Sequence, residues 1–197
     1  MTETSEGHSQ WYIDRFRALA AEGADLAGEA RTLDALLPRG ARVLDAGCGT
    51  GRIAVELANR GHHVVGVDVD PALVVAAAED HPGPEYLVAD LADLDLGDTH
   101  DPFDAAILAG NVMCFVAPDS ETDVLTSVAR HVRADGVVVV GFGLGRTLTV
   151  ADFDRHVAAA GLRLEHRFAT WDLRAWSDDA EFVVSVLRHD DARDVPK

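Results

Sequence analysis

Residues 43–52 read VLDAGCGTGR, an apolar run that ends in an acidic residue and a glycine-rich turn. The segment that follows has the apolar spacing of a helix. A strand, a glycine turn and a helix N-terminus in this order bring bare backbone N–H groups to a ligand. We therefore predict a strand over 42–46, a helix from about Thr50 to Arg60, and a nucleotide-like ligand at the turn between them.

Strand-like and helix-like segments alternate through the rest of the chain, which is typical of a parallel sheet covered by helices on both faces. Between the last two apolar runs there is no room for a crossover helix, so these two strands should be antiparallel. Residues 9–37 have helical spacing. The predicted strands are 42–46, 63–67, 85–89, 103–109, 137–142, 163–169 and 181–187, and the predicted helices after the first are about 70–80, 120–133 and 149–161.

The composition narrows the class of protein. The 197 residues are 48% hydrophobic and carry a formal net charge of −17, with Lys197 as the only lysine. Such a surface repels phosphate backbones and offers no basic patch to anionic lipids, so we expect neither nucleic acid nor membrane as a partner. Cys48 and Cys114 have no metal-ligand spacing, and the N-terminus lacks a secretory signal. We expect a cytoplasmic protein without a metal site that binds a small molecule.

Acidic residues indicate which nucleotide is bound. A dinucleotide fingerprint requires a third glycine at position 52, where this chain has Arg52. This departure disfavours a nicotinamide-dependent oxidoreductase. Asp45, Asp68 and Asp90 instead lie at the C-terminal ends of three successive predicted strands, and these ends line one crevice of the sheet. A negative rim of this kind favours a cationic ligand over a polyphosphate.

These motifs, in this order, resemble the class I S-adenosylmethionine-dependent methyltransferases of the bacterial small-molecule type. The resemblance extends over about residues 40–188. It is carried by VLDAGCGTGR at 43–52, VVGVDVD at 64–70, VAD at 88–90, FDAAILAGNVM at 103–113 and VRADGVVVVGFG at 132–143. It implies a Rossmann-like, seven-stranded, mostly parallel sheet with an antiparallel last strand and an N-terminal helical lid. The predicted organisation is a lid over 1–40 that belongs to the same domain, a methyltransferase domain over 41–189 and a disordered tail over 190–197.

The resemblance also implies a set of S-adenosylmethionine contacts. The glycine turn would approach the methionyl part, Asp68 the ribose and Asp90 the adenine. Asp45 and the main chain after the fourth strand would face the ammonium, and Arg52 the carboxylate. The implied residues are Asp45, Gly47, Cys48, Gly49, Gly51, Arg52, Asp68, Val69, Asp90, Leu91, Ala109 and Gly110.

The implied activity is transfer of a methyl group to a small acceptor by in-line displacement (EC 2.1.1.-). The segment Gly110–Met113 lacks the (Asn/Asp)-Pro-Pro-aromatic motif of enzymes that methylate amide or exocyclic amino nitrogens, and no catalytic base stands out. The predicted acceptor contacts are Tyr12, Asn111 and Arg146.

The alternative to an enzyme is a protein that binds the cofactor without catalysis, as a sensor or scaffold. Either a monomer or a homodimer is compatible with the sequence.

Overall fold

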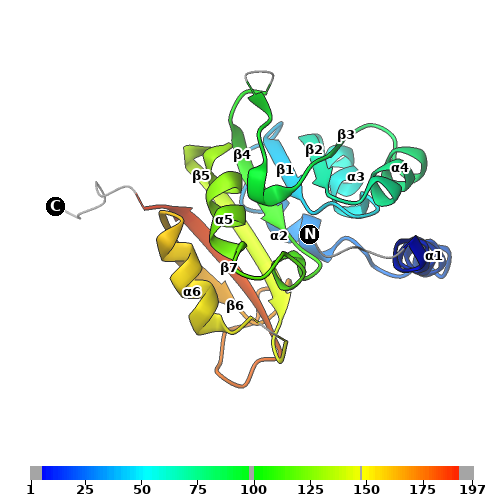
Figure 1. The fold of residues 1–197 in the computed structure, drawn as a ribbon. Helices are drawn as coiled ribbons and strands as arrows, with labels where there is room; N and C mark the ends of the chain where they lie inside the picture. The colour runs from blue at the N-terminus through cyan, green and yellow to red at the C-terminus, as the bar shows by residue number, and fades with distance from the viewer. Residues whose placement is uncertain (1–5, 98–99, 147, 191–197) are drawn as a thin grey trace.

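The computed structural model describes residues 6–97, 100–146 and 148–190. A seven-stranded sheet forms its centre, with the strand order β3-β2-β1-β4-β5-β7-β6 (Figure 1). Strand β7 is antiparallel to both neighbours, and the other pairings are parallel, so the predicted sheet is confirmed. The strands are β1 (Arg42–Ala46), β2 (His63–Asp68), β3 (Glu85–Val88), β4 (Phe103–Leu108), β5 (Val132–Gly143), β6 (Leu162–Phe168) and β7 (Phe182–His189).

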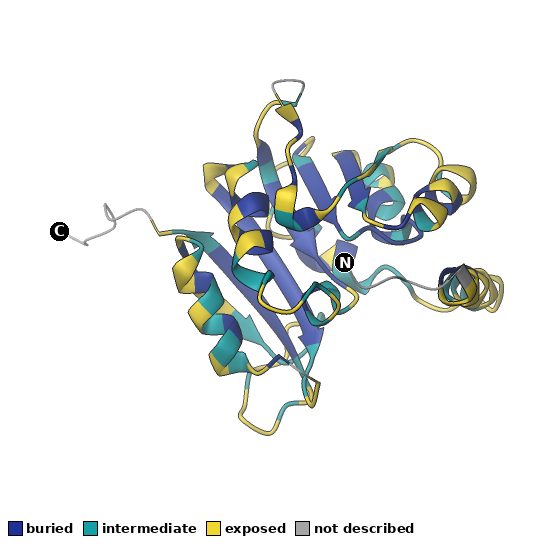
Figure 2. Cartoon of the chain, in the orientation of Figure 1, coloured by how far each residue is buried: buried dark blue, intermediate teal, exposed yellow. Residues whose placement is uncertain are grey.

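Helices cover both faces of the sheet because strand side chains alternate between them. Along β1, Leu44 faces a core built with α5 and α6, whereas Val43 faces a core built with α2 and α3. Both faces of the central strands are buried (Figure 2). The helices are α1 (Glu6–Ala21), α2 (Gly28–Asp34), α3 (Arg52–Asn59), α4 (Pro71–Asp80), α5 (Glu121–Arg130) and α6 (Val150–Ala159).

Local capping chemistry explains where two of the helices begin. Asp70 accepts a hydrogen bond from Ala72 N at 2.8 Å, and Pro71 occupies the first helical position of α4. Thr149 accepts one from Asp152 N at 3.1 Å at the start of α6. Both starts agree with the sequence prediction.

Two boundaries differ from the prediction. Residues 9–37 are not one helical run: α1 ends at Ala21, Gly23 has a φ of +75°, and α2 begins only at Gly28. A helix over 120–133 is also wrong, because α5 ends at Arg130 and β5 already begins at Val132. Val132 pairs with Phe103 of β4, and the exposed residues 133–135 then form an irregularity before the regular pairing resumes.

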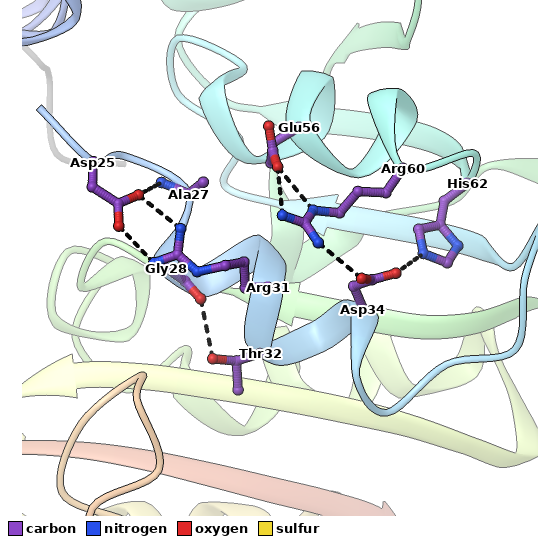
Figure 3. A network of polar contacts seen from close by, with 9 residues as sticks. All are labelled: Asp25, Ala27, Gly28, Arg31, Thr32, Asp34, Glu56, Arg60 and His62. Atoms are coloured by element: carbon purple, nitrogen blue, oxygen red, sulfur yellow. Dashed lines mark hydrogen bonds and ion pairs between the residues drawn. The ribbon is translucent and has the colours of Figure 1, made fainter. Parts of the chain in front are cut away.

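Polar contacts fix α2 against α3 and β2 (Figure 3). The Asp34 carboxylate accepts from Arg60 Nη1 at 3.0 Å and lies 2.9 Å from Nε2 of the buried His62. Arg60 also pairs with Glu56 at 2.8 Å. The hydrogen bond to His62 and the pairing with Arg60 lower the pKa of Asp34. These contacts therefore hold the C-terminal end of α3 and the start of β2 against α2.

The C-terminal end is described up to Asp190, whose N–H donates to Gly161 O at 2.9 Å. The rest of the predicted tail, residues 191–197, lies outside the described residues.

Candidate cofactor and acceptor site

The glycine turn between β1 and α3 is folded onto the end of β2. Gly47 N and Cys48 N both donate to Val67 O, at 2.7 and 2.9 Å. Gly47 has a φ of +83°, and a Cβ there would clash with Val112. Gly51 has a φ of +77°, and a Cβ there would lie 2.6 Å from Tyr86 Oη. These two positions require glycine both for backbone conformation and for close packing.

Asp45, at the end of β1, is a buried carboxylate with a solvent exposure of 1%. Neither of its oxygens accepts a hydrogen bond of good geometry among the described residues, although the backbone N–H of Ala54 lies near enough to lower its pKa slightly. Burial raises the pKa of Asp45 to about 7; Arg52 opposes this shift and Asp68 adds to it. A buried carboxylate without a partner is costly, so the site is suited to a cationic group that would pair with it.

Asp68 ends β2, the strand next to β1. Its two oxygens accept from Gly49 N at 2.9 Å and from Asp70 N at 3.0 Å, which links the carboxylate to the glycine turn. Burial raises the pKa of Asp68, partly opposed by these hydrogen bonds. Each carboxylate oxygen can accept more than one hydrogen bond, so lone pairs remain for two ligand hydroxyls.

The third predicted acid lies at the rim of the sheet. Asp90 is exposed after β3 and accepts from Ala92 N at 3.0 Å, so it also begins a short 3-10 helix, Leu91–Asp93. Leu91 is buried beneath it, whereas Val69 is 47% exposed. The carboxylate of Asp90 and the apolar surface of Val69 are thus available at the same rim as Asp68.

The Arg52 side chain has protein partners. Its Nη1 donates to Glu29 Oε2 at 3.0 Å and to Leu26 O at 2.9 Å, and its guanidinium lies 5.3 Å from the Phe16 ring centroid. Arg52 therefore joins α3 to α1 and α2. The sequence offered no signal for this ion pair, because Glu29 is 23 residues away on a separate helix.

Tyr12 of α1 lies over the glycine turn. A Cβ built on Gly49 would lie 3.4 Å from the Tyr12 ring, and one built on Gly110 would lie 3.9 Å from its hydroxyl. Burial raises the pKa of the Tyr12 phenol. The fold therefore brings Tyr12, a predicted acceptor contact, next to the predicted cofactor contacts Gly49 and Gly110.

Sequence reasoning missed the anchor of this helix. The buried hydroxyl of Ser9 donates to the Asp70 carboxylate at the start of α4, and Arg17 pairs with Asp80 at the end of α4 at 2.8 Å. A cavity of about 510 Å³ lies between α1, α3 and the segment that leads into α2. It adjoins the turn at Thr50 and Arg52. Figure 1 shows α1 at the margin of the fold, beside α4.

The end of β4 supplies the remaining predicted residues. Ala109 is buried, and Gly110 and Asn111 both have a φ of +70°. Asn111 Oδ1 accepts from Gly143 N at 2.6 Å, so its side chain joins the ends of β4 and β5. Arg146 lies beyond Gly143, with its guanidinium 5.6 Å from the Phe115 ring centroid.

Cys48 is buried inside the turn, where burial raises the pKa of its thiol, so it is a packing residue there.

No group of His, Cys, Asp and Glu side chains within residues 6–97, 100–146 and 148–190 has the arrangement of a metal site. In the same ranges, no helix is both long and apolar enough to cross a bilayer.

Comparison with known proteins agrees with this geometry. Residues 43–136 match the family model described as "Methyltransferase domain". A solved TehB-like SAM-dependent methyltransferase from Corynebacterium glutamicum is 43% identical and superposes with a TM-score of 0.89, over 94% of this chain and 100% of that one. This chain belongs to the S-adenosylmethionine-dependent methyltransferases. The methyl donor of this family, S-adenosylmethionine, is its cofactor.

Curated relatives of this methyltransferase include two O-methyltransferases. A magnesium-protoporphyrin O-methyltransferase from Rhodobacter capsulatus is 39% identical over 107 residues, which is 51% of this chain and 45% of that protein. A ubiquinone biosynthesis O-methyltransferase from Xylella fastidiosa is 33% identical over 117 residues, or 51% and 47%. The chain thus spans about half the length of the curated relatives it matches.

The site fits S-adenosylmethionine. This cofactor carries a sulfonium and an ammonium, and the Asp45 carboxylate, which has no hydrogen-bond partner among the described residues, lies beside the glycine turn. Asp68 retains lone pairs toward hydroxyl donors. A negative, partly buried crevice of this kind stabilises a cation.

Proposed function

We propose that this methyltransferase transfers a methyl group from S-adenosylmethionine to a small-molecule acceptor. The observation that carries the proposal is the buried Asp45 carboxylate, which has no hydrogen-bond partner within the described ranges and lies next to the glycine turn at 47–51. Two curated relatives are named for magnesium-protoporphyrin and for ubiquinone biosynthesis, which supports a small-molecule acceptor. We infer that the protein works in the cytoplasm as a monomer or homodimer, without nucleic acid or membrane, in keeping with its net charge of −17.

When bound, S-adenosylmethionine supplies an electrophilic methyl group on a positively charged sulfur. The residues of the chain position it. Asp45 and the main chain at Ala109 and Gly110 would accept from the ammonium, and the main chain of the glycine turn would approach the methionyl part. Asp68 would accept from the ribose hydroxyls, and Asp90 and Leu91 would meet the adenine.

The acceptor side is formed by Tyr12, Asn111 and Arg146. Tyr12 lies over Gly49 and Gly110 and would exclude water from the reacting atoms. Asn111 holds the ends of β4 and β5 together through Gly143. Holding two reactants in line in a dry site lowers the barrier without a catalytic base, provided the acceptor already has a free lone pair.

The first test is calorimetric titration with S-adenosylhomocysteine. We expect binding to the wild type, and we expect Asp68→Asn to weaken it by about 1–3 kcal/mol, the scale for hydrogen bonds to a charged group. Asp95→Asn is the matched control, because Asp95 is also an aspartate that accepts a backbone N–H, from Gly97 at 2.8 Å, but lies in an exposed loop. Absence of binding to folded wild type, or equal loss in both variants, would refute the assigned site.

A second assay separates catalysis from sensing. The protein is incubated with S-adenosylmethionine and a panel of small hydroxyl, amine, thiol and carboxylate acceptors, and S-adenosylhomocysteine is measured by mass spectrometry. Acceptor-dependent product supports the proposal. Tight cofactor binding with no product from any acceptor would favour the alternative, a protein that binds the cofactor as a sensor without catalysis.

A further inference from the structure

Arg146 and Phe115 form an exposed pair at the carboxyl end of the sheet. Phe115 follows the short 3-10 helix Val112–Cys114 after β4, and Arg146 follows β5. The Arg146 guanidinium carbon lies 5.6 Å from the centroid of the Phe115 ring, and the ring is 59% exposed. An arginine over an aromatic ring makes a cation–π contact, which holds its N–H donors in a defined plane.

This pair is attached to the cofactor site. Asn111 Oδ1 accepts from Gly143 N at 2.6 Å, and a Cβ built on Gly143 would lie 4.0 Å from Arg146 Nε. On the other side, Val112 packs so closely against Gly47 that no Cβ fits there. A series of direct contacts therefore connects the glycine turn, the end of β4 and Arg146.

The guanidinium of Arg146 is available to a ligand. In the described parts of the chain it has no carboxylate partner, although this protein has a net charge of −17 and most of its arginines form ion pairs. A guanidinium presents two parallel N–H groups that match the two oxygens of a carboxylate. The exposed face of Phe115 beside it suits a flat apolar group.

We propose that Arg146 and Phe115 select the methyl acceptor, and that this acceptor is a small planar molecule that carries a carboxylate. Arg146 binds the carboxylate, and Phe115 contacts the planar body and holds the guanidinium in place. The proposal rests on the proposed function, because it takes the ends of β4 and β5 as the acceptor side of the site.

The test uses ligand-observed NMR titrations with full-length protein saturated with S-adenosylhomocysteine. The probes are benzoate, 2-naphthoate and indole-3-carboxylate, each compared with its neutral amide. We expect at least one acid to bind, and its amide to bind about tenfold more weakly, because the amide loses a charge-assisted pair. Arg146→Gln should reduce the affinity for the acid by about tenfold, and Phe115→Leu by about threefold, since stacking is the smaller contribution.

Arg15→Gln is the matched control. Arg15 is likewise exposed, lies 5.3 Å from an aromatic centroid, that of Trp11, and has no carboxylate partner within the described residues. It should leave acid binding unchanged. Thermal unfolding of each variant should match that of the wild type, because the replaced side chains are on the surface.

The outcomes are distinct. If S-adenosylhomocysteine binds but no acid does, if the amides bind as well as the acids, or if Arg146→Gln and Arg15→Gln behave alike, the acceptor proposal is wrong and the proposed function stands. If S-adenosylhomocysteine itself does not bind, the proposed function fails, and this inference with it.

Discussion

Asp45 shows how a single residue can be unfavourable for the fold and useful for the ligand. Its carboxylate is buried at the end of β1, and burial raises its pKa to about 7 from an ordinary value near 4. Between these two pKa values the folded chain holds a proton that the unfolded chain has released. The free energy of unfolding therefore falls as pH rises from about 4 to about 7, and the loss is complete above that.

Replacing Asp45 by Asn removes this cost. We expect Asp45→Asn to raise the free energy of unfolding at pH 8 by about 1–3 kcal/mol relative to wild type, the scale for a buried group without a partner. The difference should vanish near pH 4, where both side chains are neutral. Urea unfolding at the two pH values measures it.

The same variant should bind S-adenosylhomocysteine more weakly, because it no longer pairs with the ammonium. A variant that is less stable than wild type at pH 8, or that binds the ligand unchanged, would contradict the role given to Asp45.

At the scale of elements, α1 is held by the packing of Ile13, Tyr12 and Phe16 and by two polar contacts with α4. Ser9 donates to Asp70, the N-cap residue of α4, and Arg17 pairs with Asp80 at the other end of α4. The Arg17 ion pair is largely exposed and contributes little. The Ser9 hydroxyl is buried, so its hydrogen bond should be the stronger of the two polar contacts.

We therefore expect Ser9→Ala to loosen α1 while the sheet stays intact. Losing one buried hydrogen bond of about 1 kcal/mol should speed amide exchange in α1 by about fivefold. Exchange in β1, β4 and β5 should not change. Hydrogen–deuterium exchange with mass spectrometry measures both regions.

Gln10→Ala is the control for this prediction, because Gln10 is exposed and its amide donates to Asp14 of the same helix at 2.9 Å. It should leave exchange as in the wild type. Equal exchange in α1 for Ser9→Ala and wild type would show that other contacts hold the helix.

At the scale of the whole molecule, the site draws on the carboxyl ends of three strands and on α1. The glycine turn follows β1, Asp68 ends β2, Asn111 follows β4, and Tyr12 comes from α1. A ligand that contacts all of them binds only the folded chain, and its binding energy therefore adds to the stability of the whole domain.

S-adenosylhomocysteine at one hundred times its dissociation constant should add about 2.7 kcal/mol to the free energy of unfolding. For a chain of this size we expect a rise in Tm of about 5–10 °C. Thermal unfolding at increasing ligand concentration measures it. NAD and NADH at the same concentrations should produce no shift in Tm. A comparable shift with either would support the disfavoured alternative, a nicotinamide-dependent oxidoreductase.

The sequence alone was sufficient to predict the features that depend on neighbouring residues. The periods of the apolar runs predict the strands, the Asp70 and Thr149 caps predict two helix starts, and the glycines at 47–51 predict the turn. The boundary between α5 and β5 was misplaced, because Val132 joins the sheet through a partner, Phe103, that lies 29 positions away. Apolar spacing within one segment does not reveal such a partner.

The tertiary structure alone decided which distant groups meet. It pairs Arg52 with Glu29 and places Tyr12 over Gly49 and Gly110. It also brings Ser9 into hydrogen-bond contact with Asp70, which is 61 positions away in the sequence. It also leaves Asp45 buried without a described partner and Arg146 stacked on Phe115. Spacing and capping act over a few residues, whereas burial and pairing of this kind depend on how helices pack against a completed sheet.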